Sequence, residues 1–339
     1  MQKQPPFLTI SMPVRNEERF ISNTLNELLS QEYPVDRYEI IVADGESTDR
    51  TAQAVKSISD KHPNVILLGN SKRLSSTGRN IGFKNGKGDI FLVMDGHCHI
   101  GHNQLFKNIV ICLEKSGAQC LGRPQPLDPP GLTPFQEAVA LARASRIGHG
   151  GGSYIYSDFE GFVSPASNGA IYRKEVFSRV GYVDETFEAC EDVEFNYRVE
   201  QAGFKAYMSP KLQVRYYPRQ DLKSLFGQMV RYGSGRYRLF RKHPDTLTFN
   251  TLITPLFAIF ILAALPEVLF SALGVLPFWV GLFTVYALGG YSVMVVLQSS
   301  LISLKTKGRY FLYLLPIFFI IHFGLGWGFV REAMVGRKK

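Results

Sequence analysis

The sequence predicts an α/β domain with a mostly parallel central sheet, followed by an amphipathic interface helix and a C-terminal α-helical transmembrane region. Apolar runs of strand length alternate with helix-like stretches from residue 7 to 122. A basic, aromatic stretch with helical spacing covers residues 222–242, and the chain from Asn250 to Leu304 carries one formal charge. We therefore expect three regions in chain order, at residues 1–218, 219–248 and 249–339.

The first region has the alternation of a parallel sheet. Four apolar runs have the length and composition of strands, at residues 7–12, 38–43, 65–68 and 89–94. Between them, three stretches show the apolar spacing or start signals of helices, at residues 16–31, 47–58 and 75–86. Such βαβ patterns predict parallel strands covered by helices, and ligands of such sheets bind outside the carboxyl ends of the strands. Asp44 and Asp95 fall at that edge.

The tail contains enough apolar sequence for more than one membrane crossing. A crossing needs about 20 apolar residues, and three segments supply them, at residues 252–273, 275–304 and 310–330. We expect two to three transmembrane helices, because a third full crossing would leave the basic residues 337–339 outside, against the positive-inside tendency. A carboxylate at the bilayer centre costs about 2.5–3.5 kcal/mol, so Glu267 is expected near an interface or against protein.

The basic stretch before the tail and the charge balance limit the partners. A basic amphipathic helix over residues 219–248 suits the negatively charged cytoplasmic lipid surface. The chain has 38 Lys and Arg against 29 Asp and Glu, a net charge of +9, which allows anionic lipid, nucleic acid or a phosphorylated substrate. No signal peptide begins the sequence, so the four cysteines are expected as reduced thiols in the cytosol. Residues 148–153 are expected to form a flexible loop that is either a lid or a linker.

Four short motifs fall at predicted strand ends or at the start of the third helix. They are Pro13-Val14-Arg15-Asn16-Glu17, Asp44-Gly45-Glu46-Ser47-Thr48-Asp49, Gly78-Arg79-Asn80-Ile81-Gly82 and Asp95-Gly96-His97. Together they predict a pocket with acidic groups on one side and a cation, Arg79, on the other. This mixture suits a nucleotide diphosphate held through a divalent metal, with Arg79 meeting phosphate oxygens.

In this order the motifs resemble those of the family 2 glycosyltransferases, inverting enzymes of the GT-A fold that use nucleotide-diphospho-sugars. The resemblance covers roughly residues 7–235. It includes Glu191-Asp192, which is similar to the ED motif, and Gln228-Met229-Val230-Arg231-Tyr232, which is similar to the QxxRW motif with Tyr in place of Trp. The basic helix and apolar tail resemble the membrane-bound exopolysaccharide branch, of the succinoglycan type.

The resemblance implies a role for each of these residues. The nucleotide sugar would be bound by Pro13, Arg15, Glu17, Asp44, Arg79 and Asp95. Asp192 would be the catalytic base, and Glu191 beside it would raise its proton affinity or orient the acceptor. Closure of the site on the acceptor would fall to Gln228, Arg231 and Tyr232.

Asp95 and His97 would hold the metal, although position 97 departs from the family pattern, which usually has a second Asp. Imidazole binds Mn²⁺ and other transition metals, whereas Mg²⁺ prefers oxygen ligands. His97 therefore either ligates Mn²⁺ directly or gives its place to water and phosphate oxygens, and the expected cofactor is Mn²⁺ or Mg²⁺. The run His97-Cys98-His99 also allows zinc, but the sequence has no second ligand pair at zinc-like spacing.

The implied function is transfer of a sugar from a UDP- or GDP-sugar to a hydroxyl of a lipid-linked saccharide, in cell-surface polysaccharide biosynthesis at the inner (cytoplasmic) membrane. The α/β domain would face the cytoplasm. The alternatives are a polyprenyl-phosphate glycosyltransferase that charges a lipid phosphate directly, and a small membrane transporter with a nucleotide-sensing domain. Membrane lipid is an expected partner. Nucleic acid is not, because acids at the strand ends repel its phosphates unless a metal intervenes.

Overall fold

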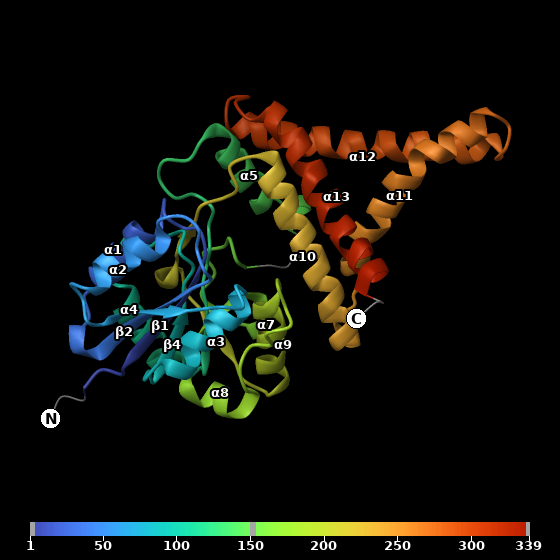
Figure 1. Cartoon of the computed structure of the whole chain (residues 1–339). Helices are drawn as coiled ribbons and strands as arrows, with labels where there is room; N and C mark the ends of the chain where they lie inside the picture. Colours follow the sequence, from blue (N-terminus) through green and yellow to red (C-terminus); the bar gives the residue numbers. More distant parts are fainter. Residues whose placement is uncertain (1–3, 150–153, 337–339) are drawn as a thin grey trace. The chain divides into compact units, whose positions relative to one another are not determined.

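The computed structural model describes residues 4–149 and 154–336 (Figure 1). The chain divides into two compact units, which we call the sheet unit (Met1–Pro130 and Gly152–Tyr217) and the helical unit (Gly131–Gly151 and Pro218–Lys339). Residues 150–153 of the predicted Gly-rich loop and the basic residues 337–339 lie outside the described residues.

An eight-stranded sheet, in the order β3-β2-β1-β4-β8-β6-β9-β7, forms the centre of the sheet unit. Its strands are β1 (Leu8–Val14), β2 (Tyr38–Asp44), β3 (Val65–Gly69), β4 (Ile90–Val93), β6 (Cys120–Gly122), β7 (Gly161–Val163), β8 (Gly169–Arg173) and β9 (Ala206–Met208). The first four are parallel to one another, which confirms the prediction for residues 7–94. β8 was not predicted, and it runs antiparallel between β4 and β6.

Helices cover the sheet, and a small second sheet accompanies it. The helices of this unit are α1 (Ile21–Leu29), α2 (Thr51–Ser59), α3 (Ser75–Asn85), α4 (Leu105–Ser116), α7 (Pro165–Asn168), α8 (Lys174–Val180) and α9 (Glu191–Gln201). The second sheet pairs β5 (Cys98–His99) with β10 (Arg215–Tyr216) in antiparallel fashion. β5 starts directly after His97, so this pair extends from the predicted metal motif.

Two helices begin later than the sequence predicts, because their predicted first residues form turns that bind each other. We expected helices from residues 16 and 47, but α1 begins at Ile21 and α2 at Thr51. Asn16 has a φ of 57°, in the left-handed region, and its side-chain oxygen accepts the backbone N–H of Thr48 at 2.8 Å. Ser47 in turn donates through its backbone N–H and its hydroxyl to the carboxylate of Asp44. The two loops therefore fold against each other at the carboxyl edge of the sheet.

α3 lies against β1 with almost no space between the backbones. A Cβ on Gly82 would lie 2.1 Å from the hydroxyl of Ser11, and a Cβ on Gly78 would lie 2.7 Å from the Cβ of Pro13. Only glycine allows this approach. The Ser11 hydroxyl also donates to the backbone carbonyl of Arg79 at 3.2 Å, so the register of α3 along β1 is fixed at the residue that supplies the predicted cation.

The helical unit joins three long apolar helices to shorter helices that carry charges. It contains α5 (Pro134–Ala144), α6 (Arg146–His149), α10 (Leu222–Lys242), α11 (Phe249–Ala272), α12 (Phe278–Lys305) and α13 (Phe311–Val335). The last three are long and apolar enough to cross a membrane. The sequence analysis assigned residues 131–151 to the α/β domain at residues 1–218, whereas the structure groups them with the helical unit. The reason is packing, because Ala138, Val139 and Ala142 of α5 share one apolar cluster with Leu314 and Phe318 of α13.

Glu267 faces protein, as the sequence analysis expected. The hydroxyl of Thr284 in α12 donates to its carboxylate at 2.7 Å, so the charge in the long apolar tail has a polar partner on the neighbouring helix.

The contact between α3 and β1 predicts the effect of one added methyl group. Gly82→Ala should destabilise the chain by about 1–3 kcal/mol, because the methyl group overlaps Ser11 and must push α3 away from the sheet. The matched control is Gly227→Ala in α10, where a Cβ meets nothing within 4 Å and alanine favours the helix by up to about 1 kcal/mol. Melting temperatures of the detergent-purified variants measure both effects. Equal melting temperatures for Gly82→Ala and the parent would contradict the close approach.

Candidate active site

The predicted donor-binding residues line the carboxyl ends of β1, β2 and β4. Pro13 lies in β1 beneath Gly78, and Arg15 follows the strand with its side chain exposed. Asp44 is the last residue of β2, and both of its carboxylate oxygens accept hydrogen bonds from Ser47, at 2.5 Å from the hydroxyl and 3.1 Å from the backbone N–H. Asp44 therefore shapes the turn after β2 in addition to any role in binding.

The Asp-Gly-His motif after β4 is held by a histidine–carboxylate pair. Nδ1 of His97 lies 2.7 Å from Oε1 of Glu17, which comes from the loop after β1. The rings of Phe20 and Tyr216 meet the imidazole edge-on, at centroid distances of 6.5 and 5.9 Å. A carboxylate on one ring nitrogen fixes the tautomer and the direction of the other nitrogen, as it does for histidines that bind metals. The expected contact of Glu17 with the nucleotide sugar stays a prediction, and in the structure the carboxylate of Glu17 pairs with His97.

Thr24 is a site residue that sequence reasoning missed. It belongs to α1, it is fully buried, and its hydroxyl lies 2.8 Å from the carbonyl of Gly96 and 3.0 Å from that of Cys98. The turn that presents Asp95 and His97 is therefore tied to α1. The sequence contains a weak signal, because a threonine on the apolar face of a predicted helix needs a buried polar partner.

Arg79 interacts both with the acids at the start of α9 and with the predicted metal residue Asp95. Its guanidinium Nη2 lies 3.2 Å from Oε1 of Glu191, with side-chain exposures of 12% and 7%. Burial opposes the charge of Arg79, but the carboxylates of Glu191, Asp192 and Asp95 outweigh it and raise the pKa of Arg79. Asp95 after β4 and Asp192 at the start of α9 thus both act on one buried cation.

Glu191 has a raised affinity for protons. Burial raises the pKa of Glu191 above its ordinary value of 4.5, Arg79 lowers it, and the like charge of Asp192 raises it further, so that the pKa is raised overall. A buried carboxyl group whose pKa is raised and which pairs with a specific cation is typical of functional sites.

The start of α9 reaches this edge because β8 is antiparallel. Ile171 pairs with Leu92, so the first residue of β8, Gly169, lies near the carboxyl end of β4. The carbonyl of Gly169 accepts the side-chain N–H of Asn196 in α9 at 2.9 Å. Just before α9 begins, Cys190 has a φ of 61°, a left-handed conformation that turns the chain into the helix.

A second clamp joins α3 to the segment that precedes α9. The Asn80 side chain donates to the carbonyl of Val183 at 2.8 Å and accepts its N–H at 3.0 Å. Asn80 also donates to Glu185 at 2.9 Å. The Gly-Arg-Asn motif therefore contributes the cation, Arg79, and also Asn80, which holds the segment before α9 against α3. Sequence reasoning recognised only the cation.

Arg123, at the end of β6, is the largest side chain that is almost fully buried, with 1% exposed. It donates to the carbonyl of Val93 at 2.9 Å and to the hydroxyl of Tyr216 at 2.5 Å. Val93 is the last residue of β4 and Tyr216 belongs to β10, so Arg123 ties together the two strands beside the Asp-Gly-His turn. Nothing in the sequence pattern distinguishes this arginine from the exposed ones.

Gln228, Arg231 and Tyr232 lie in the helical unit, on α10. The Gln228 side chain donates to the Tyr232 hydroxyl at 3.2 Å, and the guanidinium of Arg143 in α5 lies 5.9 Å from the centre of the Tyr232 ring. Arg231 is exposed. Their expected role at the acceptor stays a prediction.

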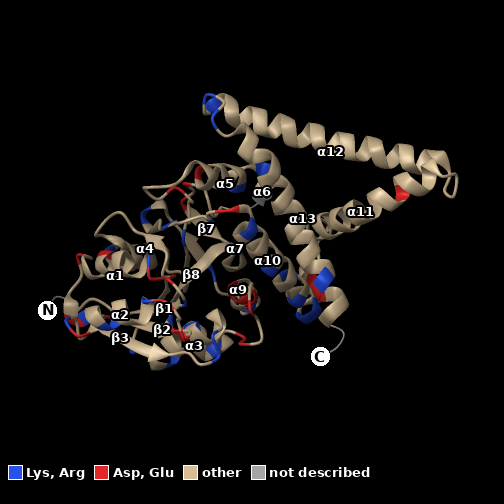
Figure 2. Cartoon of the chain, turned by 45° about the horizontal axis from the view of Figure 1, so that its top comes forward, with Lys and Arg blue, Asp and Glu red and all other residues tan. Residues whose placement is uncertain are grey.

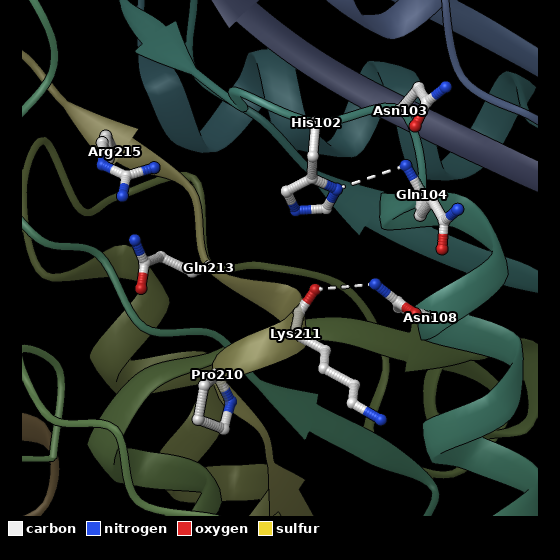
Figure 3. Close-up of a pocket in the computed structure, with 8 residues that line it drawn as sticks. All are labelled: His102, Asn103, Gln104, Asn108, Pro210, Lys211, Gln213 and Arg215. Carbon is white, nitrogen blue, oxygen red and sulfur yellow. Dashed lines mark hydrogen bonds between the residues drawn. The ribbon is translucent and has the colours of Figure 1, made fainter.

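A polar pocket of about 500 Å³ lies elsewhere in the sheet unit, between the segments 102–108 and 210–215 (Figure 3). The backbone N–H of Gln104 donates to Nδ1 of His102 at 3.2 Å, and the Asn108 side chain donates to the carbonyl of Lys211 at 3.1 Å. None of the residues predicted for the active site lines it.

Comparison with known proteins identifies the family. The family model described as glycosyl transferase family 2 matches residues 9–181, just over half of the chain, and the model of glycosyl transferase family group 2 matches residues 141–330. The succinoglycan biosynthesis protein ExoA of Rhizobium meliloti is 31% identical over 236 residues, which are 69% of this chain and 70% of that protein. The chain belongs to glycosyl transferase family 2.

A second relative matches this family 2 chain over nearly its whole length. The dolichyl N-acetyl-alpha-D-glucosaminyl phosphate 3-beta-D-2,3-diacetamido-2,3-dideoxy-beta-D-glucuronosyltransferase of Methanococcus voltae is 26% identical over 338 residues, 98% of each chain. Among solved structures, the mannosyltransferase PcManGT from Pyrobaculum calidifontis, in complex with GDP-Man and Mn²⁺, covers 94% of this chain and 88% of its own, with a TM-score of 0.56 and 15% identity. At that identity the likeness concerns the fold, and it supports the GT-A fold of this family 2 protein.

The donor set of the family 2 chain fits a metal that is shared with a ligand. Within residues 4–149 and 154–336, no three His, Cys, Asp or Glu side chains are grouped to hold an ion by themselves. Asp95 is half-buried, and its carboxylate has no hydrogen-bond or ion-pair partner among the described residues. Divalent ions at phosphate sites are commonly bound by one or two protein side chains, with phosphate oxygens and waters completing the shell. A carboxylate and an imidazole that is oriented by Glu17 match this mode.

The contacts of Thr24 predict that its hydroxyl stabilises the metal motif. Thr24→Val keeps the shape of the side chain but removes the donor to the Gly96 and Cys98 carbonyls, at a cost of about 1–3 kcal/mol. Hydrogen exchange at the backbone amides of residues 95–98 should become faster and the melting temperature should fall. Thr24→Ser, which keeps the hydroxyl, is the control. Unchanged exchange in Thr24→Val would show that this hydroxyl does not hold the turn.

Proposed function

We propose that this family 2 protein is an inverting, metal-dependent glycosyltransferase. It transfers a sugar from a UDP- or GDP-sugar to a hydroxyl of a lipid-linked saccharide in cell-surface polysaccharide biosynthesis. The proposal rests on the buried cation Arg79, whose guanidinium lies 3.2 Å from Glu191, the neighbour of Asp192, and whose positive charge is also favoured by Asp95. A donor diphosphate beside Asp95 and an acceptor hydroxyl beside Asp192 would therefore occupy one edge of the sheet.

The donor diphosphate would lie at the ends of β1, β2 and β4. Asp95 and His97 would hold a divalent ion, Mn²⁺ or Mg²⁺, which supplies positive charge to the leaving diphosphate when it is bound. Arg79 contributes a second positive charge, and its buried Nε has no partner among the described residues, so it is open to a phosphate oxygen. The exposed Arg15 and the turn at Asp44 would contact the rest of the nucleotide. Pro13 and Glu17 act through the neighbours that they support, α3 and His97.

The acceptor reaction needs one proton to be removed. The acceptor oxygen forms a bond to the anomeric carbon of the sugar while the bond from that carbon to the diphosphate breaks, which inverts the configuration. Asp192 takes the proton of the acceptor hydroxyl, and a positioned base is typically worth about 10²–10⁴ in rate. Glu191, held by Arg79, keeps the start of α9 in place and adds negative charge beside the base.

The acceptor class rests on the relatives and on the helical unit. The Methanococcus voltae relative is named for a dolichyl-phosphate-linked sugar, and the Rhizobium meliloti relative is named for succinoglycan biosynthesis. Three helices able to span a membrane would keep this chain where such acceptors reside. Gln228, Arg231 and Tyr232 would contact the acceptor. We place the protein in the inner (cytoplasmic) membrane with the sheet unit in the cytoplasm, because the cations that precede α11 and follow α12 favour that side.

Asp192→Asn tests the proposed base. This variant should fold and bind nucleoside diphosphate but lose transfer by about 10²–10⁴-fold, because the amide cannot accept the proton. Transfer from each UDP- and GDP-sugar is measured in membrane fractions, and binding is measured as thermal stabilisation by UDP or GDP with Mn²⁺, which a chelator should remove.

The control for this experiment is Asp60→Asn, which changes an exposed carboxylate paired with Lys56 and should leave both readouts unchanged. Near-normal transfer by purified Asp192→Asn would end the assignment of the base. Absence of stabilisation by either nucleoside diphosphate in the parent chain would end the assignment of the donor.

The raised pKa of Glu191 predicts the acidic side of the pH profile. As the pH falls, Glu191 takes up a proton at a pH above 4.5 and its ion pair with Arg79 weakens, so kcat/KM should begin to fall above that pH. Glu191→Gln should lower the rate and move the remaining acidic limb to lower pH, because the group with the raised pKa is gone. Glu200→Gln, on the same helix, is the control and should keep the parent profile. An unmoved limb in Glu191→Gln would assign the limb to another group.

A further inference from the structure

The third apolar helix of the helical unit differs from the other two in what surrounds it. α11 and α12 expose large apolar side chains along most of their length, among them Leu262, Leu269, Phe283 and Leu297. In α13, by contrast, every residue from 320 to 330 is buried or half-buried. A helix that faces lipid needs an exposed apolar surface, and this stretch of α13 does not have one.

The C-terminal half of α13 is covered by α10, a helix that carries charges. Cβ atoms on Gly324 and Gly328 would lie 2.7 Å from Cβ of Met229 and 2.1 Å from the carbonyl of Val230, so the two backbones are in direct contact. Further along, Arg238 of α10 pairs with Glu332 of α13 at 2.8 Å. Figure 1 shows the two helices running side by side. α10 exposes Arg231 and Arg236 along this contact.

One face of the N-terminal half of α13 packs against α5 and α6, which also carry charges, while Leu312 and Phe319 on another face are exposed. Before α13 begins, the hydroxyl of Tyr310 donates to Glu137 of α5 at 2.5 Å, and Arg309 lies 3.6 Å from the same carboxylate. Near the middle of α13, Nε2 of His322 donates to the carbonyl of Ile147 in α6 at 2.7 Å. The residue before Ile147 is the exposed Arg146.

These contacts conflict with a transmembrane α13. If His322 lay at the bilayer centre, Arg146 would enter the hydrocarbon beside it, and Arg231 and Arg236 would follow with α10. Each arginine near the bilayer centre costs about 2.5–3.5 kcal/mol.

We propose that α13 does not cross the membrane. It is the apolar core of an interfacial platform formed by α5, α6, α10 and α13, and within the described residues only the α11–α12 hairpin enters the bilayer. α11, with 24 residues, and α12, with 28, are long enough to cross a hydrocarbon core of about 30 Å and return. The chain therefore has two spans, and the end of α13 lies on the same side as α10.

The distribution of charge supports the same arrangement. Lys305, Lys307 and Arg309 follow α12, while the basic end of α10 precedes α11, so both ends of the hairpin are cationic (Figure 2). The turn between the two helices, residues 273–277, carries no charge. A two-span topology places all these cations on one side, as the positive-inside rule requires, and Glu267 lies toward the turn, where Thr284 pairs with it.

The proposal is tested by the side from which single cysteines react. The four native cysteines are buried, so they give little background. Met334→Cys and Val335→Cys report the end of α13, Arg236→Cys reports α10, and Val275→Cys reports the hairpin turn. All four positions are exposed. Each full-length variant is treated with a membrane-impermeant maleimide in right-side-out and in inverted sealed vesicles, with detergent-solubilised samples as the measure of complete reaction.

We expect residues 334 and 335 to react in the same vesicles as residue 236, and to lose that reaction in vesicles of the other orientation. Residue 275 should react with the opposite preference. Reaction of residues 334 and 335 from the side opposite to residue 236 would overturn the proposal and make α13 a third span. Reaction of residue 275 from the same side as residue 236 would also overturn it, because the hairpin would then not cross.

Discussion

The ion pair between Arg79 and Glu191 is the contact on which the geometry of the candidate site depends. A guanidinium and a carboxylate that are both nearly buried must face each other, since removing one partner of such a pair costs about 3–5 kcal/mol. Arg79 comes from α3, whose position on β1 is set by two glycines, and Glu191 comes from α9, more than 100 residues later. The pair therefore brings the predicted base into the electrostatic reach of the predicted metal residue.

The antiparallel strand β8 makes this meeting possible. If β8 were parallel to β4, its first residue, Gly169, would lie at the opposite edge of the sheet, away from the carboxyl end of β4. Because β8 runs against β4, its first residue lies beside the end of β4, and the hydrogen bond between Gly169 and Asn196 then places α9 at the same edge. Asn80 adds a second connection through Val183. The acids are thus positioned by buried polar contacts, and such contacts specify one arrangement because every alternative leaves a polar group without a partner.

In the helical unit, glycines determine how closely the helices pack. Gly324, Gly326 and Gly328 let α13 approach the backbones of α10 on one face and of α11 on another. Small residues at a helix contact allow the two backbones to approach closely. Its close contact with the basic helix α10 distinguishes α13 from α11 and α12, although all three have similar hydropathy along the sequence. Hydropathy shows that a segment is apolar enough to enter the bilayer, whereas the packing of the helices shows which of its faces other helices already occupy.

The sequence by itself determined the four parallel strands, the acids at their ends, the family motifs and the three apolar helices, because these depend on local periodicity and on residue types at element ends. It could not place the start of α1, where Asn16 binds the loop after β2, nor β8, whose few residues lack a distinctive pattern. It also missed the roles of Thr24, Asn80 and Arg123, and it did not foresee that Glu17 pairs with His97. Each of these roles was decided by tertiary structure, since each is a hydrogen bond between residues far apart in the chain, and such a pairing exists only once the sheet has brought both partners to the same edge.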